Sequence, residues 1–240
     1  MAVFEQLENI LAELHTKICQ NLTIFPKEQH PFATFKSLDG SIEGALLTYS
    51  GEVVDKLIYA KINAKPMSFG TMRLTTWLNS TIAVPHLAFE FGTMPNLFFY
   101  MDYIPRIDLW TNLDYFENYY GAVNETYLEF RENPDLSLFV SKSLYVRQLQ
   151  SPAHICFTST HGENALELVR TLAHEMCDRW LVWVDQADPV AEANRSALAE
   201  RDRHMRRLSA ERDSGNAAIA KILGEDFTHQ LVRALWEAES

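Results

Sequence analysis

Two acidic residues lie inside strand-like segments that are otherwise apolar. The segment "HLAFEFGTMPNLFFYMDY", residues 86 to 103, reads as two β-strands joined by a turn, with Glu90 in the first and Asp102 in the second. A carboxyl group in an apolar pocket is desolvated, which raises its pKa and lets it hold a proton for delivery near neutral pH. These residue types therefore predict proton transfer. The alternative for Glu90 is a solvated outer face of the sheet or an ion pair with lysine or arginine.

The alternation of side chains along a strand decides what Glu90 can contact. Phe89 and Phe91 share one face of their strand, and Glu90 points to the other. The first face can pack under helices, whereas the second could form the floor of a ligand pocket. Whether Asp102 lies on the Glu90 face depends on the loop at residues 93 to 96, because a one-residue change there swaps the pairing. The sequence leaves both pairings open.

A further acidic candidate, Asp213, lies in "ERDSGN", where a long charged helix is expected to end. Aspartate favours turns because its side chain accepts hydrogen bonds from the nearby backbone. A local structural role is therefore the alternative to a catalytic one for Asp213.

Motifs for bound cofactors are absent from the sequence. There is no GxGxxG, no GxxxxGK[ST] and no GxSxG, and "HEMCD" at residues 174 to 178 lacks the second histidine of HExxH. The eight histidines show no metal-ligand spacing, and the three cysteines are too scattered for a CxxC motif or a disulfide framework. We therefore expect no bound metal or nucleotide cofactor, and a reducing compartment. If the chain is an enzyme, carboxylates and the substrate itself must supply its chemistry.

The first half of the chain changes from a helical to a strand period. Residues 3 to 20 place apolar side chains at helical spacing. Residues 30 to 105 contain short β-rich runs separated by turn signals. The linkers between these runs are too short for crossover helices, so the sheet should be mostly antiparallel.

The second half of the chain is mostly helical. Residues 112 to 132 look helical or irregular, and "SLYVRQLQ" and "AHICFTST" are expected to add two strands. Residues 163 to 187 form an amphipathic helix and residues 190 to 212 a charged one, and short helices finish the chain.

This order of elements predicts the α+β class, with one domain over residues 1 to 240 and a central antiparallel sheet covered by helices. The composition is 47% hydrophobic with a formal net charge of −11, which permits a large core and disfavours nucleic acid as a partner. Neither a signal peptide nor an apolar run of membrane-spanning length is visible. We therefore expect a cytoplasmic protein without a membrane span.

Four segments together resemble one known family. They are "TWLNSTIAVPHLAFEF", "YIPRIDLWTNLDYFENYY", "SKSLYVRQLQSPAHI" and "ERDRHMRRLSAERDSGNAAIAKILG". Over about residues 75 to 224 the chain resembles the red chlorophyll catabolite reductases, which belong to the ferredoxin-dependent bilin reductases.

The resemblance implies an α/β/α sandwich that holds a linear tetrapyrrole between the sheet and the C-terminal helices. It implies reduction of red chlorophyll catabolite to a primary fluorescent catabolite, with electrons from reduced ferredoxin and no bound cofactor. A homodimer is also implied, and a plastid stroma location if this is a trimmed plant or algal protein. The alternatives are reduction of biliverdin or another bilin, and a non-catalytic tetrapyrrole carrier.

The resemblance also suggests site residues. Glu90 and Asp213 match two pocket acids that donate protons or position pyrrole nitrogens. Val140 matches a pocket position that influences product stereochemistry, where some plant members have phenylalanine. Tyr100 stands near the place of a strand histidine in the biliverdin-reducing branches, which favours the chlorophyll-catabolite branch. The candidate pigment-binding residues are Asn79, Tyr100, Asp102, Val140 and Arg147.

Two further aspartates and a basic cluster complete the expectations. Asp114 is a possible secondary acid, whereas Asp108 is expected to anchor a loop. A ferredoxin is acidic, so docking needs a local basic patch. The candidates are Lys142, Arg147, Arg201, Arg203, Arg206, Arg207 and Arg212. The alternative is a solvated helix on which acidic and basic residues alternate.

Overall fold

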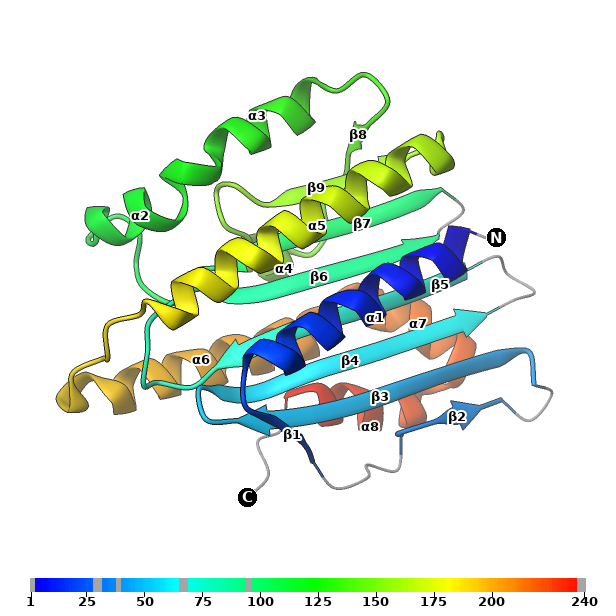
Figure 1. The fold of residues 1–240 in the computed structure, drawn as a ribbon. Coiled ribbons are helices and arrows are strands. Elements are labelled where there is room, and N and C mark those ends of the chain that lie inside the picture. The colour runs from blue at the N-terminus through cyan, green and yellow to red at the C-terminus, as the bar shows by residue number, and fades with distance from the viewer. Residues whose placement is uncertain (1–2, 28–31, 38–39, 65–68, 94–95, 237–240) are drawn as a thin grey trace.

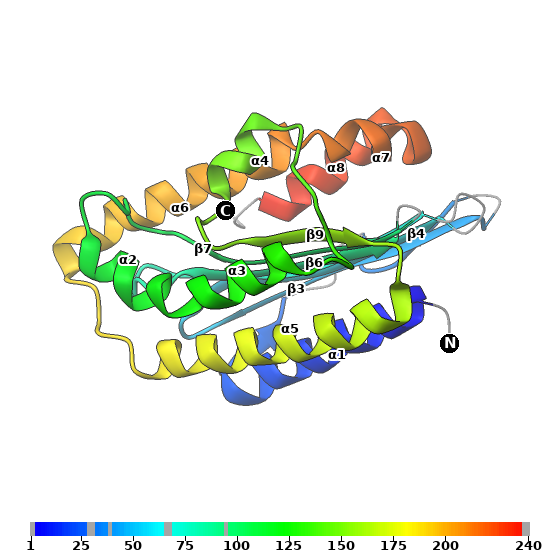
Figure 2. The same cartoon turned by 90° about the horizontal axis from the view of Figure 1, so that it is seen from above.

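Three layers make up the fold. A computed structural model describes residues 3–27, 32–37, 40–64, 69–93 and 96–236. Figure 1 shows helices on both sides of one large sheet, and Figure 2 shows the three layers from above. The expected α+β class and the α/β/α sandwich are thereby confirmed. None of the helices in the described ranges is long and apolar enough to cross a membrane.

Within the described residues the central sheet has nine strands, in the order β1-β3-β4-β5-β6-β7-β9-β8, with β2 paired to β3. The strands are β1 (Ile24–Pro26), β2 (Phe35–Lys36), β3 (Ile42–Gly51), β4 (Val54–Ala64), β5 (Phe69–Leu78), β6 (His86–Thr93), β7 (Leu97–Ile104), β8 (Ser137–Leu138) and β9 (Ile155–Ser159). The pairings between them are antiparallel. From β3 to β7 each strand pairs with the next along the chain, as the short linkers predict.

One face of the sheet is covered by α1 (Val3–Asn21) and α5 (Gly162–Asp185). Both helices bury the apolar stripes that their periodicity predicts, and Phe89 and Phe91 of β6 pack into the same core. The segment predicted as helical or irregular forms α2 (Leu113–Tyr119), a short 3-10 turn η2 (Gly121–Val123) and α3 (Asn124–Glu132). Phe130 of α3 packs on this face against Phe99 and Phe157.

The opposite face carries α4 (Leu144–Leu149), α6 (Glu192–Arg212), α7 (Gly215–Leu223) and α8 (Glu225–Trp236). A second, smaller core lies here, formed by Leu46, Ile58 and Ile62 of the sheet with Leu231 and Ala234 of α8. Side chains on this face do not close against the helices everywhere, and the space left between them forms the pockets described below.

The prediction that "SLYVRQLQ" forms a strand is wrong, because these residues form the short helix α4. Ser143 caps the helix, with its Oγ accepting a hydrogen bond from the N–H of Val146. The same hydroxyl donates to the carbonyl of Arg212 at 3.0 Å, which fastens α4 to the end of α6. The apolar side chains that suggested a strand, Leu144 and Tyr145, are exposed. The other predicted strand, "AHICFTST", is confirmed as β9.

A buried charged cluster ties α6 to the sheet. Arg106, which follows β7, is fully buried, and its guanidinium donates to Asp202 of α6 through Nε at 3.0 Å. His86 of β6 is also fully buried. Its Nδ1 accepts a hydrogen bond from the N–H of Leu78, and its Nε2 lies 3.3 Å from Asp202 Oδ1. The cluster therefore fixes the position of the helix that ends at Asp213.

His86 should make stability depend on pH. Burial, together with the charge of Arg106, lowers the pKa of His86 from 6.5 to about 4. Below pH 6.5 His86 is protonated in the unfolded chain but stays neutral in the native protein. The free energy of unfolding therefore falls with decreasing pH. The expected loss between pH 6.5 and pH 4 is about 3 kcal/mol from this residue alone.

Urea unfolding at several pH values measures this contribution, provided that other titrating groups are subtracted. His86→Gln should flatten the profile by about that amount, whereas His229→Gln, at an exposed position, should leave it unchanged. An unaltered profile in His86→Gln would show that the histidine is not the titrating group.

Candidate functional site

The register of β6 and β7 places Glu90, Tyr100 and Asp102 on the same face of the sheet. Glu90 lies opposite Tyr100, and Ala88 lies opposite Asp102. This face is turned toward α6, α7 and α8, away from the core that contains Phe89. The loop that was expected to decide the pairing includes residues 94 and 95, which lie outside the described residues.

Two neighbouring pockets open on this face, and they share Arg73, Glu90 and Asp213 as lining residues. The larger has a volume of about 540 Å³, which is in the usual range for small-molecule sites. Its floor is formed by strands β5, β6, β7 and β9, and its rim by the 139–142 segment, α4 and the end of α6. Aromatic side chains on the pocket face that line it are Trp77, Phe98, Tyr100 and Phe139. The smaller has a volume of about 90 Å³.

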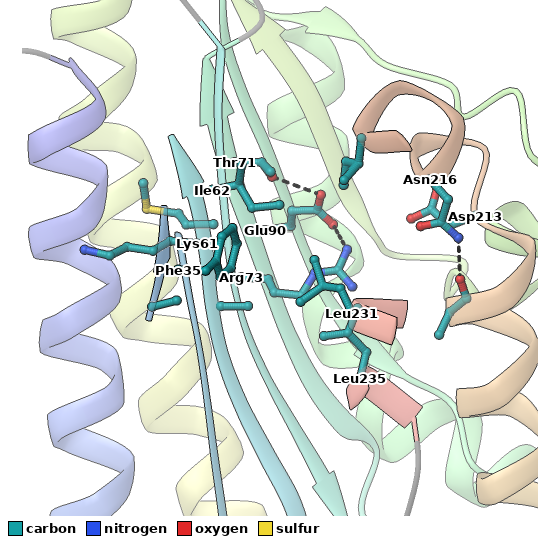
Figure 3. A pocket seen from close by; sticks show the side chains of 15 residues that line it. Phe35, Lys61, Ile62, Thr71, Arg73, Glu90, Asp213, Asn216, Leu231 and Leu235 are labelled. Atoms are coloured by element: carbon teal, nitrogen blue, oxygen red, sulfur yellow. Dashed lines mark hydrogen bonds and ion pairs between the residues drawn. The ribbon is translucent and has the colours of Figure 1, made fainter. Parts of the chain in front are cut away.

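Glu90 is both a pocket residue and half of an ion pair. Its Oε2 lies 2.9 Å from Nη2 of Arg73, and its Oε1 accepts a hydrogen bond from Thr71 Oγ1 at 3.4 Å. Arg73 and Glu90 are directly opposite each other on β5 and β6. Figure 3 shows both interactions at the centre of the smaller pocket, with Leu231 and Leu235 of α8 nearby. The ion pair proposed as an alternative for Glu90 is therefore confirmed.

Asp213 caps the end of α6 and lines both pockets. Its Oδ1 accepts a hydrogen bond from the N–H of Gly215 at 2.8 Å, which is the local turn role expected from the sequence. In Figure 3 Asp213 and Asn216 lie across the pocket from Glu90. The sheet and the helical layer thus each contribute a carboxyl group to one site.

Asp102 does not line either pocket, but it is hydrogen bonded to Tyr100, which lines the larger one. It is buried, and its Oδ2 accepts hydrogen bonds from Tyr100 Oη at 2.8 Å and from the N–H of Ser151 at 3.0 Å. Burial raises the pKa of Asp102, although the hydrogen bonds from Ser151 oppose this effect. Burial and the neighbouring Asp102 also raise the pKa of Tyr100 well above its ordinary value. Tyr100 therefore lines the pocket as a neutral phenol.

The other predicted binding residues lie at different distances from the pockets. Val140 lines the rim of the larger pocket and is 61% exposed. Asn79 is not among the lining residues, and its amide donates to the carbonyl of Glu52 at 2.8 Å in a turn. Arg147 is exposed on α4 and donates to the carbonyl of Ser141 at 2.7 Å.

The two additional aspartates lie outside the pockets. Asp108 anchors the loop after β7, as expected, because its Oδ1 accepts hydrogen bonds from the N–H of Thr111 at 2.9 Å and from its hydroxyl at 2.7 Å. Asp114 is exposed in the first turn of α2 and does not line either pocket.

Most residues of the basic cluster are exposed, but one is buried. Arg206 is 3% exposed, and its Nη1 lies 2.6 Å from Asp55 Oδ2, so the prediction that it docks a partner is wrong. Arg207 is exposed but pairs with Glu211 one turn along the same helix. Arg201, Arg203, Arg212 and Lys142 are also exposed.

Arg73 is the site residue that the sequence reasoning missed. It lies in "MRLTTWL", where a single charge interrupts an apolar strand. That interruption is the same signal that singled out Glu90, and two opposite charges in adjacent strands form a cross-strand pair when the register allows it. Across the described residues, no group of three or more histidine, cysteine, aspartate or glutamate side chains could hold a metal ion.

Comparison with known proteins gives consistent results. The family model described as red chlorophyll catabolite reductase (RCC reductase) matches residues 7–237. A red chlorophyll catabolite reductase of Hordeum vulgare is 28% identical over 174 residues, which cover 67% of this chain and 84% of that protein. Red chlorophyll catabolite reductase 1, chloroplastic, of Oryza sativa subsp. japonica is 26% identical over 204 residues, which cover 78% of this chain and 61% of that protein.

Among solved structures, the fold is similar to that of phytochromobilin synthase from tomato in complex with biliverdin. The TM-score is 0.80 at 16% sequence identity, and the match covers 98% of this chain and 83% of the tomato chain. This likeness supports the fold.

Proposed function

The chain belongs to the red chlorophyll catabolite reductase family, and from this premise we propose that it reduces a linear tetrapyrrole with electrons from reduced ferredoxin. The observation that carries the proposal is a mostly apolar pocket of about 540 Å³, lined in part by aromatic side chains, with Glu90 on its floor and Asp213 at its edge. Aromatic walls suit a flat conjugated pigment. Carboxyl groups supply the protons that a reduced pigment must receive.

The proposed reaction is a two-electron reduction in single-electron steps. Reduced ferredoxin gives one electron to the conjugated pigment, and a proton from a carboxyl group neutralises the resulting radical anion. A second electron and a second proton complete the new C–H bonds. The pigment is itself the electron acceptor, so the chain needs no resident flavin or nicotinamide. Glu90 and Asp213 are the proposed proton donors, replenished from solvent.

The first candidate substrate is red chlorophyll catabolite, which both curated relatives carry in their names. The second candidate is biliverdin, which the tomato enzyme of similar fold binds. Tyr100 favours the first candidate, because a neutral phenol replaces the strand histidine expected of the biliverdin-reducing branches. Val140 leaves the rim of the pocket wider than a phenylalanine would, which bears on the stereochemistry of the product.

Docking of ferredoxin is proposed at the exposed cations around the end of α6. Arg207, Arg212 and Lys142 are exposed there, with Arg203 one turn before Arg207, and Lys142 lines the rim of the larger pocket. An acidic partner steered to these cations would deliver electrons close to the pigment.

The test is anaerobic incubation of the protein with reduced ferredoxin and each pigment, followed by absorption spectra and product chromatography. We expect loss of red chlorophyll catabolite absorption and a fluorescent product. Reduction of biliverdin alone would support the second candidate. Binding without reduction of either pigment would identify a carrier and overturn the proposed activity.

A further inference from the structure

Arg73 has the charge and the position of an anion-binding group in the pocket. Its Nη2 donates a hydrogen bond to Glu90 Oε2 at 2.9 Å. Among the described residues, this is the one hydrogen bond of the Arg73 guanidinium. An arginine side chain has several further N–H donors in a planar fork. Arg73 lines both pockets, so its side chain borders the space that a ligand would occupy. They fit the two oxygens of a second carboxylate.

The charges around Arg73 keep it cationic. The Glu90 carboxylate, opposed by burial, raises the pKa of Arg73 above its ordinary value, and Asp213 adds to the effect. The other cations among the described lining residues are Lys61 and Lys142. The ammonium group of Lys61 pairs with Glu8 of α1 on the opposite face of the sheet, and Lys142 is exposed at the rim. Arg73 is therefore the cation best placed to meet a ligand inside the pocket.

We infer that Arg73 binds an ionised carboxylate of the substrate. The substrate carboxylate then replaces Glu90 as the ion-pair partner of Arg73. The inference rests on the proposed function, because linear tetrapyrroles carry propionate side chains. If Glu90 takes up a proton as it is released, the net charge around Arg73 stays the same. Substrate binding would then convert a carboxylate that cannot donate a proton into a carboxylic acid that can. Arg73 is thus a positioning residue as well as a binding one.

The surroundings of Glu90 are consistent with this exchange. Arg73 and Thr71 face it from β5 and Tyr100 lies opposite on β7. Cys156 of β9 and Asp213 at the end of α6 are further titratable groups of the site. The lysines among the described lining residues are Lys61, which pairs with Glu8, and Lys142 at the rim, so Arg73 is the cation that pairs with Glu90. Once the guanidinium has turned to another carboxylate, a carboxyl group in this mostly apolar pocket favours its neutral form.

The experiment compares a pigment acid with its ester in the dark, without ferredoxin, so that turnover plays no part. Red chlorophyll catabolite and its propionate methyl ester, and biliverdin and its dimethyl ester, are titrated into the protein, and absorption changes give the dissociation constants. Wild type should bind the acid at least about tenfold more tightly, because the ester cannot make a charge-assisted hydrogen bond to the guanidinium. Arg73→Gln should bind both with equal affinity. Lys221→Gln, at an exposed position outside both pockets, is the control and should keep the wild-type preference.

A second readout follows the proton. Calorimetry of the wild type in buffers of different ionisation enthalpy should show proton uptake with the acid and none with the ester. Glu90→Gln should abolish the uptake while the preference for the acid is retained. A residue that only supports the structure would move neither quantity in this pattern. If Arg73→Gln does not fold, Arg73→Lys and the wild-type comparison of acid with ester decide the question.

The outcomes separate the two proposals. If wild type binds the acid and the ester equally well, or if Arg73→Gln keeps the preference for the acid, the Arg73 inference is overturned and the proposed function stands. If wild type binds neither red chlorophyll catabolite nor biliverdin, the proposed function fails, and the inference fails with it.

Discussion

Replacing Glu90 by glutamine is expected to lower turnover of the pigment by about 100-fold or more, with pigment affinity retained or increased. Glutamine keeps the size of the side chain and can still accept a hydrogen bond from Thr71. It cannot deliver the proton that follows each electron. It also leaves Arg73 without its carboxylate partner, which favours binding of an acidic pigment. The loss should therefore appear in kcat rather than in KM.

Asp213→Asn provides a second, independent case. Asparagine can still accept the hydrogen bond that Asp213 receives from the N–H of Gly215, so the turn after α6 should be preserved. A fall in turnover would then report lost proton delivery rather than a displaced helix. Asp226→Asn, at an exposed position outside both pockets, is the control and should turn over normally. Normal turnover in both Glu90→Gln and Asp213→Asn would show that these residues are not the proton donors.

Features of the site that depend on local alternation could be predicted from the sequence, whereas those that depend on the pairing between strands could not. Alternation along β6 is a local property, and it predicted that Glu90 points away from Phe89 and Phe91. The facing of Asp102 required the register between two strands, which short apolar segments do not specify by themselves. The same holds for Arg73, whose pairing with Glu90 exists only because β5 and β6 align these two residues.

Two errors have a different cause. "SLYVRQLQ" contains the short apolar run Leu144–Val146, which resembles a strand, and what makes it helical is a cap at Ser143 and its attachment to the end of α6. Arg206 looks like its exposed neighbours because its helix is charged on nearly every side, yet this position faces Asp55 of the sheet layer. In both cases tertiary contacts decide a choice that local pattern leaves balanced.

Asp202→Asn is expected to lower the free energy of unfolding by about 3–5 kcal/mol at pH 7, because it breaks a buried ion pair from one side. Asp202 accepts from Arg106 through Nε at 3.0 Å and through Nη2 at 2.5 Å. The remaining donors of Arg106 go to carbonyl oxygens, including that of Ile82 at 2.6 Å. Without the carboxylate, a fully buried guanidinium would face only neutral partners. Chemical denaturation at pH 7 measures the loss.

The pH range of that measurement follows from Asp202. Burial alone would raise its pKa, but the hydrogen bonds and charges of His86 and Arg106 bring the pKa below its ordinary value of 3.8. A carboxylate with a lowered pKa stabilises the native state above the unfolded value, and this contribution is lost as the pH falls through the folded value. The effect of Asp202→Asn should therefore be full at pH 7 and diminish only in strong acid. Glu200→Gln, on an exposed position of the same helix, should change stability by less than about 0.5 kcal/mol.

A double variant separates the cost of an orphaned charge from the value of the pair. Arg106→Met with Asp202→Leu removes both charges and keeps apolar volume, so it should be more stable than Asp202→Asn. If instead the double variant is the less stable of the two, the pair itself stabilises the fold. The same variants report on the site. Asp202 anchors α6 to the sheet, and the C-terminal end of α6 positions Asp213 at the pocket. Turnover that survives in the stable double variant would mean that packing alone can position α6. Turnover that is lost there, with stability retained, would assign the buried ion pair to the geometry of the site.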